Sequence, residues 1–180
     1  LGAGVSGHTS AAFLKKWLGT KHEVTVVSPQ EFYNWIPSNI WVGVGLMKPQ
    51  KVLRPLAPIY KRHGVDFKQA RAVALFPEGS AENQSPSVEI EWTLPGREGQ
   101  REKIPYDFLI NATGPKLNFE ATKGLGPGKH SLSVCTASHA AEASLGLDEA
   151  VARMKRGDRQ RFFPATPHGG CACTCAAFEY

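Results

Sequence analysis

The stretch LGAGVSG at residues 1–7 places glycines at the spacing Gly2-x-Gly4-x-x-Gly7. In a turn between a strand and a helix, the first glycine permits the tight bend and the second lets a pyrophosphate approach the backbone. The third lets the helix pack closely against the strand. The N-terminus of the following helix adds N–H donors and the positive end of its dipole. The motif therefore predicts a dinucleotide-binding turn, with Leu1 as the last residue of a buried strand.

Both ends of the sequence are abrupt. The chain has no initiator Met, and FEY at 178–180 stops in what reads as the first turn of a helix, without a cap. We therefore expect an internal piece of a longer protein, truncated at both ends.

Composition indicates a globular protein: 42% of the residues are hydrophobic and 21% charged, with a net charge of +5. No apolar run approaches the roughly 18 residues that a membrane span requires. Lys and Arg are scattered along the chain, so we expect no nucleic-acid partner. Three of the four cysteines lie in CACTC at 171–175, which is unlike a secreted disulfide framework. That cluster could ligate zinc, but structural zinc sites usually use CxxC pairs, and we expect no metal.

Alternating strand and helix patterns predict an α/β fold. A helix is expected over 7–18, with Phe13, Leu14, Trp17 and Leu18 on one side and Gly19 as its stop. Strands are expected at 24–28, 65–67, 70–76, 88–94 and 106–114, a helix over 51–64 ending at Gly64, a further helix within 129–155, and a second strand, turn and helix start over 161–180.

The second predicted strand ends at Ser28, where a nicotinamide-binding fold would carry an acidic residue. A serine hydroxyl can still bond a ribose oxygen, but more weakly and without charge. In YDFLINATG, an apolar run stops at Thr113 and Gly114, which suits either closure over a nucleotide or a plain strand end.

Cys135 precedes a helix predicted to begin near Thr136. N–H donors at a helix N-terminus favour the thiolate form of a cysteine. His139 follows four residues later and would share a helical face with Cys135 if the turn were already wound there. The alternative is a buried structural thiol.

The segments GAGVSG, VTVVSPQEFYNWIPSNIWVGVG, RPLAPIY, YDFLINATGPKL, SVCTASHA and CAAFEY, in that order, resemble the N-terminal part of sulfide:quinone oxidoreductases. The flavoprotein subunit of flavocytochrome c sulfide dehydrogenase and the type II NADH dehydrogenases are similar but more distant. The resemblance implies a flavoprotein with two dinucleotide-binding domains. An FAD-binding Rossmann-like domain would cover 1–128, and a connecting helix with the beginning of a second Rossmann-like domain would cover 129–180.

The resemblance also implies a peripheral membrane enzyme, on the cytoplasmic or periplasmic face of a prokaryotic membrane, that oxidises sulfide through a cysteine pair beside FAD and passes electrons to quinone. Membrane contact and the second redox cysteine would belong to a part outside this chain, so we expect the chain alone to be inactive. Cys135 would be one redox cysteine, with His139 as its catalytic neighbour. The residues that would bind FAD are Gly2, Gly4, Gly7, Ser28, Pro37, Ser38, Ala72, Thr113, Gly114 and Lys116.

Three alternatives stay open at this point. A type II NADH:quinone oxidoreductase would need a second glycine turn after HGG, where this chain has Cys173 and Cys175. A flavocytochrome c-type sulfide dehydrogenase would use another electron acceptor. A non-catalytic FAD-binding fragment would lack the second redox cysteine. The sequence leaves the oligomeric state open, and Cys171 and Cys175 have no counterpart in the family pattern.

Overall fold

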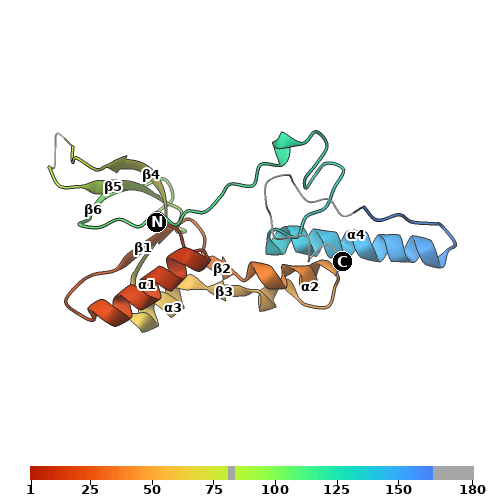
Figure 1. Ribbon diagram of the computed structural model, residues 1–180, viewed down its shortest axis with the longest axis horizontal. Coiled ribbons are helices and arrows are strands. Elements are labelled where there is room, and N and C mark those ends of the chain that lie inside the picture. The colour runs from red at the N-terminus through yellow and green to blue at the C-terminus, as the bar shows by residue number, and fades with distance from the viewer. Residues whose placement is uncertain (81–83, 164–180) are drawn as a thin grey trace. The chain divides into compact units, whose positions relative to one another are not determined.

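The computed structural model describes residues 1–80 and 84–163, and the chain divides into two compact units. The first unit comprises Leu1–Tyr33 and Pro55–Lys116. The second comprises Asn34–Arg54 and the described residues from Leu117 onward (Figure 1). The predicted domain boundary between 128 and 129 stays a prediction. Most of the strand, turn and helix start expected over 161–180 lies outside the described residues.

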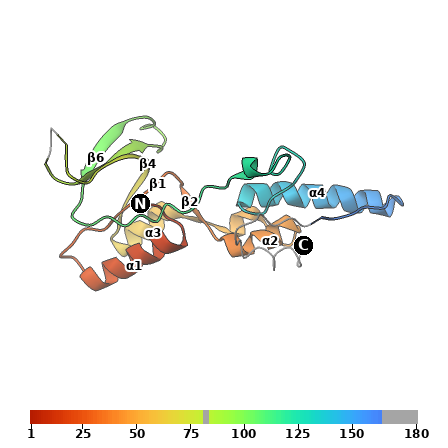
Figure 2. The ribbon, with the colours of Figure 1, turned by 45° about the horizontal axis from the view of Figure 1, so that its top comes forward.

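The first unit is an α/β structure around one four-stranded sheet of order β1-β4-β5-β6. β1 pairs with β4 in parallel, whereas β4–β5 and β5–β6 are antiparallel. Figures 1 and 2 show α1 and α3 side by side, away from the β5–β6 hairpin. Its elements are α1 (Val5–Leu18), β1 (Thr25–Ser28), α3 (Leu56–His63), β4 (Asp66–Phe76), β5 (Ser87–Trp92) and β6 (Arg101–Pro105). The short strands β2 (Phe32–Asn34) and β3 (Leu53–Pro55) form a second sheet where the chain passes from one unit to the other.

Leu1 and Gly2 lie beside β1 in the place of a further strand. The Gly2 amide donates to the carbonyl oxygen of Val27 (2.8 Å). On the other side, the Leu1 amino group donates to the carbonyl oxygen of Ile110 (2.6 Å), and the Ala112 amide donates to that of Leu1 (2.8 Å). The segment predicted as a strand at 106–114 therefore runs alongside Leu1. It is not a regular strand, because only these two bonds pair it.

Glycines end the helices of this unit where the sequence predicts. Gly19 (φ +61°) follows α1, and Gly64 in the left-handed conformation (φ +66°) follows α3. α3 is shorter than the expected 51–64 helix because it begins only after Pro55, whose N-terminal neighbours extend into β3.

Two expectations about the strands were wrong. Residues 65–67 and 70–76 form one strand, β4, with a register shift between Ala72 and Ala74 that marks a bulge. β6 was missed because its charged sequence, REKIP, is typical of a turn. It is held by an antiparallel backbone ladder to β5, and the exposed Arg101 adds cross-strand ion pairs at 3.1 Å from Glu91 and 4.0 Å from Glu89.

The apolar core of the first unit contacts α1 through small residues. Gly7 and Ala11 are the buried residues of this helix, and Ala11 packs with Val26 and Tyr60. Phe13 and Trp17 share one side of α1 as expected, with ring centroids 5.3 Å apart, but they are 46% and 72% exposed. The side of α1 that carries the large apolar side chains is therefore exposed, and the side with the small residues is buried.

In the second unit, α2 (Asn39–Gly43) lies alongside α4 (Ala137–Lys155) in both ribbon views. Val42 of α2 and Ala137 and Ala140 of α4 share one apolar core with Val52, which lies in neither helix. α4 is the alanine-rich helix that the sequence predicts within 129–155. The unit also contains the short 3-10 helices η1 (Ile36–Ser38), η2 (Pro49–Lys51) and η3 (Phe119–Ala121).

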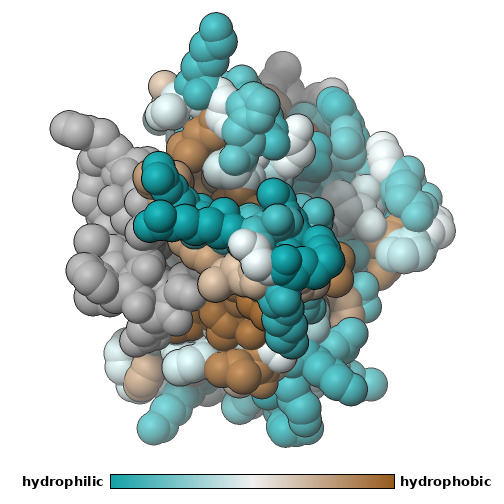
Figure 3. All heavy atoms as spheres, turned by 90° about the vertical axis from the view of Figure 1, so that its right-hand side faces the viewer, coloured by the Kyte–Doolittle hydropathy of each residue, from teal (hydrophilic) through white to brown (hydrophobic). Residues whose placement is uncertain are grey.

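The described surface mixes polar and apolar side chains. On the face drawn in Figure 3, hydrophobic patches lie among hydrophilic side chains. Exposed apolar residues of the second unit include Leu46, Leu145 and Met154. No helix among the described residues is long and apolar enough to cross a membrane.

We expect Gly7→Ala to lower the free energy of unfolding by about 3 kcal/mol, because a Cβ built on Gly7 would lie 2.1 Å from the carbonyl oxygen of Gly2. Gly4→Ala is the matched control. A Cβ there meets no described atom within 4 Å, so stability should change by no more than about 0.5 kcal/mol. Urea unfolding of both variants measures the difference, and equal midpoints would contradict the close contact.

Candidate functional site

The glycines of the first turn serve two different purposes. Gly2 has φ +94°, and a Cβ on it would lie 2.3 Å from the carbonyl oxygen of Ala112. Gly7 is confined in the same way by Gly2 itself. Gly2 and Gly7 are therefore glycines because the protein's own backbone leaves no room for a side chain.

Neither the backbone conformation nor a close contact with the described protein requires a glycine at Gly4. Its backbone is extended (φ −73°, ψ −169°), a conformation open to any residue. It is exposed, and no described heavy atom lies within 4 Å of a Cβ built on it. The space beside Gly4 is thus open, as the sequence predicts for the place where a pyrophosphate meets the backbone.

The N-terminus of α1 at this turn carries no compensating negative group. Its N-cap, Gly4, offers no side chain to cap the helix, and the first turn has no acidic residue. Since the first N–H groups of a helix point along its axis, out of the N-terminus, and have no helical partners, they can bind an anion with help from the helix dipole.

Thr113 lies against the same turn. Its Cα is 3.0 Å from a Cβ built on Gly2. Asn111, which the sequence analysis missed, orders this strand end, because its Oδ1 accepts from the Thr113 amide (3.2 Å) and hydroxyl (2.8 Å). An Asn two residues before a turn is the usual signal for such a contact. The structure thus brings Gly2, Gly7 and Thr113 together, while Gly114 (φ +72°) and Lys116 follow as exposed residues.

Ser28 and Ala72 lie on neighbouring strands of the sheet. Ser28 ends β1, is 4% exposed and accepts a hydrogen bond at Oγ from the Gln30 amide (3.3 Å). Because Oγ is the acceptor in that bond, its own hydrogen is left to donate. Ala72 pairs with Ile90 of β5 at the bulge of β4, where ladder pairing is interrupted.

An aromatic cluster backs the first turn of α1 and was not predicted. His8 Nδ1 lies 3.3 Å from the Tyr60 hydroxyl, and the His8 ring centroid is 5.5 Å from those of Tyr33 and Tyr60. Burial, followed by the charge of His63, lowers the pKa of His8, and burial raises the pKa of Tyr60 to about 12. Both groups are therefore uncharged at neutral pH, and an anion at this turn would be held by backbone N–H groups.

The remaining predicted site residues lie in the second unit. Pro37 is exposed and Ser38 half-buried in η1, directly before α2. Cys135 is a free, half-buried thiol, and its amide donates to Ser133 Oγ (3.1 Å). Thr136 caps α4 by accepting from the His139 amide (3.2 Å), so the predicted helix start near Thr136 is confirmed.

Cys135 and His139 do not share the helical face that the sequence analysis considered for them. Thr136 is extended (φ −132°, ψ 159°), so the turn at Cys135 is not wound and a shared helical face does not form. His139 instead contacts Phe119 edge-on, with ring centroids 6.1 Å apart. Its Nδ1 is buried and has no hydrogen-bond partner among the described residues. The catalytic roles of Cys135 and His139 stay predictions.

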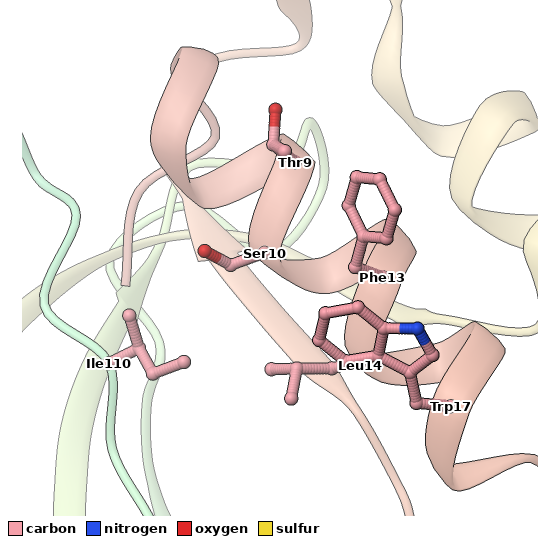
Figure 4. Close-up of a pocket in the computed structure, with 6 residues that line it drawn as sticks. All are labelled: Thr9, Ser10, Phe13, Leu14, Trp17 and Ile110. Carbon is pink, nitrogen blue, oxygen red and sulfur yellow. The ribbon is translucent and has the colours of Figure 1, made fainter.

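An open groove of about 280 Å³ runs along the exposed apolar side of α1. Figure 4 shows Leu14 pointing across it toward Ile110 on the opposite segment, with Phe13 and Trp17 on the same helix as Leu14. No predicted site residue lines this groove, so it is distinct from the glycine turn.

The described residues place no group of three His, Cys, Asp or Glu side chains where they could hold a metal ion. The cysteines of the CACTC stretch, Cys171, Cys173 and Cys175, lie outside the described residues.

Known proteins resemble the chain over most of its length. The sulfide-quinone reductase of Aquifex aeolicus (strain VF5) is 30% identical over 152 residues, which are 84% of this chain and 31% of that protein. The X-ray structure of the sulfide:quinone oxidoreductase from Aquifex aeolicus matches with a TM-score of 0.65 and 29% identity, over 84% of this chain and 31% of that one.

A second group of relatives is named for another electron donor. The external alternative NAD(P)H-ubiquinone oxidoreductase B4, mitochondrial, of Arabidopsis thaliana is 27% identical over 125 residues, 69% of this chain and 20% of that protein. Its B3 counterpart is 28% identical over 116 residues, 63% of this chain and 19% of that protein. No protein-family model matches the chain.

The chain spans less than a third of the length of each of these relatives, and the share is 31% for the Aquifex aeolicus protein. Its described part has the α/β, Rossmann-like fold that the sequence predicts, with a mixed parallel and antiparallel sheet. By sequence and by structure, the chain resembles the sulfide:quinone oxidoreductases over 84% of its length.

Proposed function

We propose that this chain is the FAD-binding part of a quinone-linked oxidoreductase, and that sulfide is its electron donor. The observation that carries the proposal is Gly4, a glycine that the protein's own backbone does not require, at the uncapped N-terminus of α1. An approaching anion explains both features, and the pyrophosphate of a dinucleotide is such an anion.

The residues around the turn fit an FAD nucleotide. Gly2, Gly4 and Gly7 would hold the pyrophosphate, Ser28 would donate its free hydroxyl hydrogen to a ribose oxygen, and the interrupted ladder at Ala72 would leave main-chain groups for the adenine. Thr113 and Gly114 would close the same edge. For Pro37, Ser38 and Lys116, the assignment to the cofactor rests on the resemblance alone. Bound FAD would supply a two-electron acceptor that a quinone can reoxidise.

Sulfide is favoured over NADH as the donor. Ser28 brings no carboxylate to the ribose, whereas a carboxylate is the usual partner of NAD in this fold. The relative named for sulfide matches more of the chain at higher identity than those named for NAD(P)H. A flavocytochrome c-type sulfide dehydrogenase shares these features and differs in its electron acceptor. A non-catalytic FAD-binding fragment would share only the cofactor site.

Cys135 is proposed as a redox sulfur. Oxidation of sulfide requires a protein sulfur that can form and release a sulfur–sulfur bond. Cys135 is the cysteine within the described residues, is half-buried and stands immediately before the N-cap of α4. We further propose that the protein acts at a membrane surface, which it would contact through a part outside this chain.

Gly4→Ala should weaken FAD binding at least tenfold, about 1.4 kcal/mol, because the added methyl group would occupy the space left for the pyrophosphate. Fluorescence titration of the purified apoprotein with FAD measures the affinity. The unchanged urea midpoint expected for this variant separates a lost ligand contact from a damaged fold. Equal FAD affinity in wild type and variant would remove the turn from the cofactor site.

Anaerobic mixing of the flavin-loaded protein with each donor tests the choice between sulfide and NADH. We expect the flavin absorbance band to bleach rapidly with sulfide and slowly, or not at all, with NADH. The control is chemical reduction by dithionite, which shows how much flavin can be reduced. Rapid bleaching by NADH and none by sulfide would reverse the assignment.

In the full-length protein, Cys135→Ser should leave FAD content and thermal midpoint unchanged, since the change is nearly isosteric, while sulfide turnover falls by at least about a thousandfold, or roughly 4 kcal/mol. Cys171→Ser and Cys175→Ser are the matched controls and should have much smaller effects, because neither matches a redox position of the family. If the Cys135 variant turns over sulfide at a near-normal rate with full flavin, Cys135 takes no part in the reaction.

A further inference from the structure

Two side-chain amides face each other in the second unit. Asn34 Nδ2 donates to Asn39 Oδ1 (2.9 Å), and Asn39 Nδ2 donates to Asn34 Oδ1 (3.2 Å). Asn39 is 0% exposed, and Asn34 Nδ2 also lies 3.5 Å from the carbonyl oxygen of Val52. Each amide therefore fixes the orientation of the other, with Asn39 fully buried and Asn34 half-buried.

The same pair holds the N-terminus of α4. Asn34 Oδ1 also accepts from the amide of Ala137 (3.0 Å), which lies 103 positions later in the sequence and is the first residue of that helix. The first N–H groups of a helix have no partner within the helix. Asn34 thus supplies from a distant segment a cap that the residues next to the helix do not provide for Ala137.

Every second backbone amide from Cys135 to His139 donates a hydrogen bond to a side-chain oxygen. Ser133 Oγ accepts from the Cys135 amide, Asn34 Oδ1 from Ala137 and Thr136 Oγ1 from His139. The apolar contacts of α2 with α4 hold the helix in place but are non-directional. The three hydrogen bonds set the path of the backbone that carries the Cys135 thiol, and only the one from Asn34 comes from outside this segment.

We propose that Asn34, oriented by Asn39, is a positioning residue for Cys135. The inference rests on the proposed role of Cys135 as a redox sulfur. Asn34 would act through the Ala137 amide, by holding the turn at 133–139 in the one conformation that presents the thiol for reaction. A buried amide pair with a merely structural role would stabilise the unit without affecting the rate of sulfide oxidation beyond the loss of folded protein.

The test compares Asn34→Leu, which fills a similar volume without an acceptor, with Asn34→Asp, which keeps an oxygen for the Ala137 amide. Met47→Ala is the matched control, because Met47 packs against the same apolar core and takes no part in these hydrogen bonds. For each variant, made in the flavin-loaded full-length protein, we would measure urea stability, flavin content, kcat and KM for sulfide, and site-resolved hydrogen exchange of the amides of Cys135 and Ala137.

Asn34→Leu is expected to lower kcat at least tenfold with little change in KM or flavin content, and to speed exchange of both amides at least tenfold. Asn34→Asp should keep kcat within about threefold of wild type, since a carboxylate also accepts at a helix N-terminus. Met47→Ala should lose stability while kcat stays normal. The proposal is overturned if Asn34→Leu leaves kcat and exchange unchanged, or if kcat in all three variants follows stability alone.

If Asn34→Leu does not fold, Asn39→Ala replaces it. This variant removes the amide that orients Asn34 but keeps the acceptor for Ala137, so kcat should fall and amide exchange should speed up by at least about threefold, and no change in either would overturn the proposal. Hydrogen exchange also separates the two proposals. Normal sulfide turnover in Cys135→Ser would refute the role of Cys135, whereas unchanged exchange in Asn34→Leu would refute the role of Asn34.

Discussion

The close approach of the Gly7 backbone to the carbonyl group of Gly2 is the constraint on which the first unit depends. A Cβ at Gly7 would lie 2.1 Å from that oxygen, and one at Gly2 would lie 2.3 Å from the carbonyl oxygen of Ala112. Three backbone segments therefore meet without side chains between them. Their contact sets the start of α1 beside Leu1 and Thr113, and it leaves the first N–H groups of the helix facing an open space at Gly4.

The N-termini of α1 and α4 are arranged in opposite ways, and the difference matches the chemistry proposed for each. α1 begins at Gly4 with no side-chain cap, so its donors are available to an anion. At α4, Asn34 and Thr136 already accept from the amides of Ala137 and His139. Fewer donors are left there for an external anion, and the fixed backbone serves to hold Cys135 in place. The N-terminus of α1 therefore suits the binding of an anion, and the N-terminus of α4 suits the positioning of Cys135.

The sequence predicts best those structural features that are determined by residues next to each other in the chain. The glycine turn, the stops at Gly19 and Gly64 and the start of α4 follow from neighbouring residues, and all were predicted correctly. β6 was not, because it is held by a backbone ladder to β5, which leaves little signal in a short charged segment. Nor could the sequence indicate Asn34 as a cap for a helix 103 positions away. Contacts of that range depend on packing, which leaves no periodic signal in the sequence.

The strand β4 changes partners halfway along its length. Asp66 to Gln69 pair with β1 in parallel, whereas Ala70 to Phe76 pair with β5 in antiparallel fashion. No residue of β4 is paired in both ladders, but the β5–β6 hairpin is tied to β1 by packing, because Val27 of β1 shares one core with Val88, Ile90 and Trp92 of β5. The hydroxyl of Thr93, directly after β5, also lies 3.1 Å from the carbonyl oxygens of Pro29 and Gln69. In evolutionary terms, the exposed turn at the tip of the hairpin can vary in length more freely than β5, whose inward residues pack against the strand that ends at Ser28.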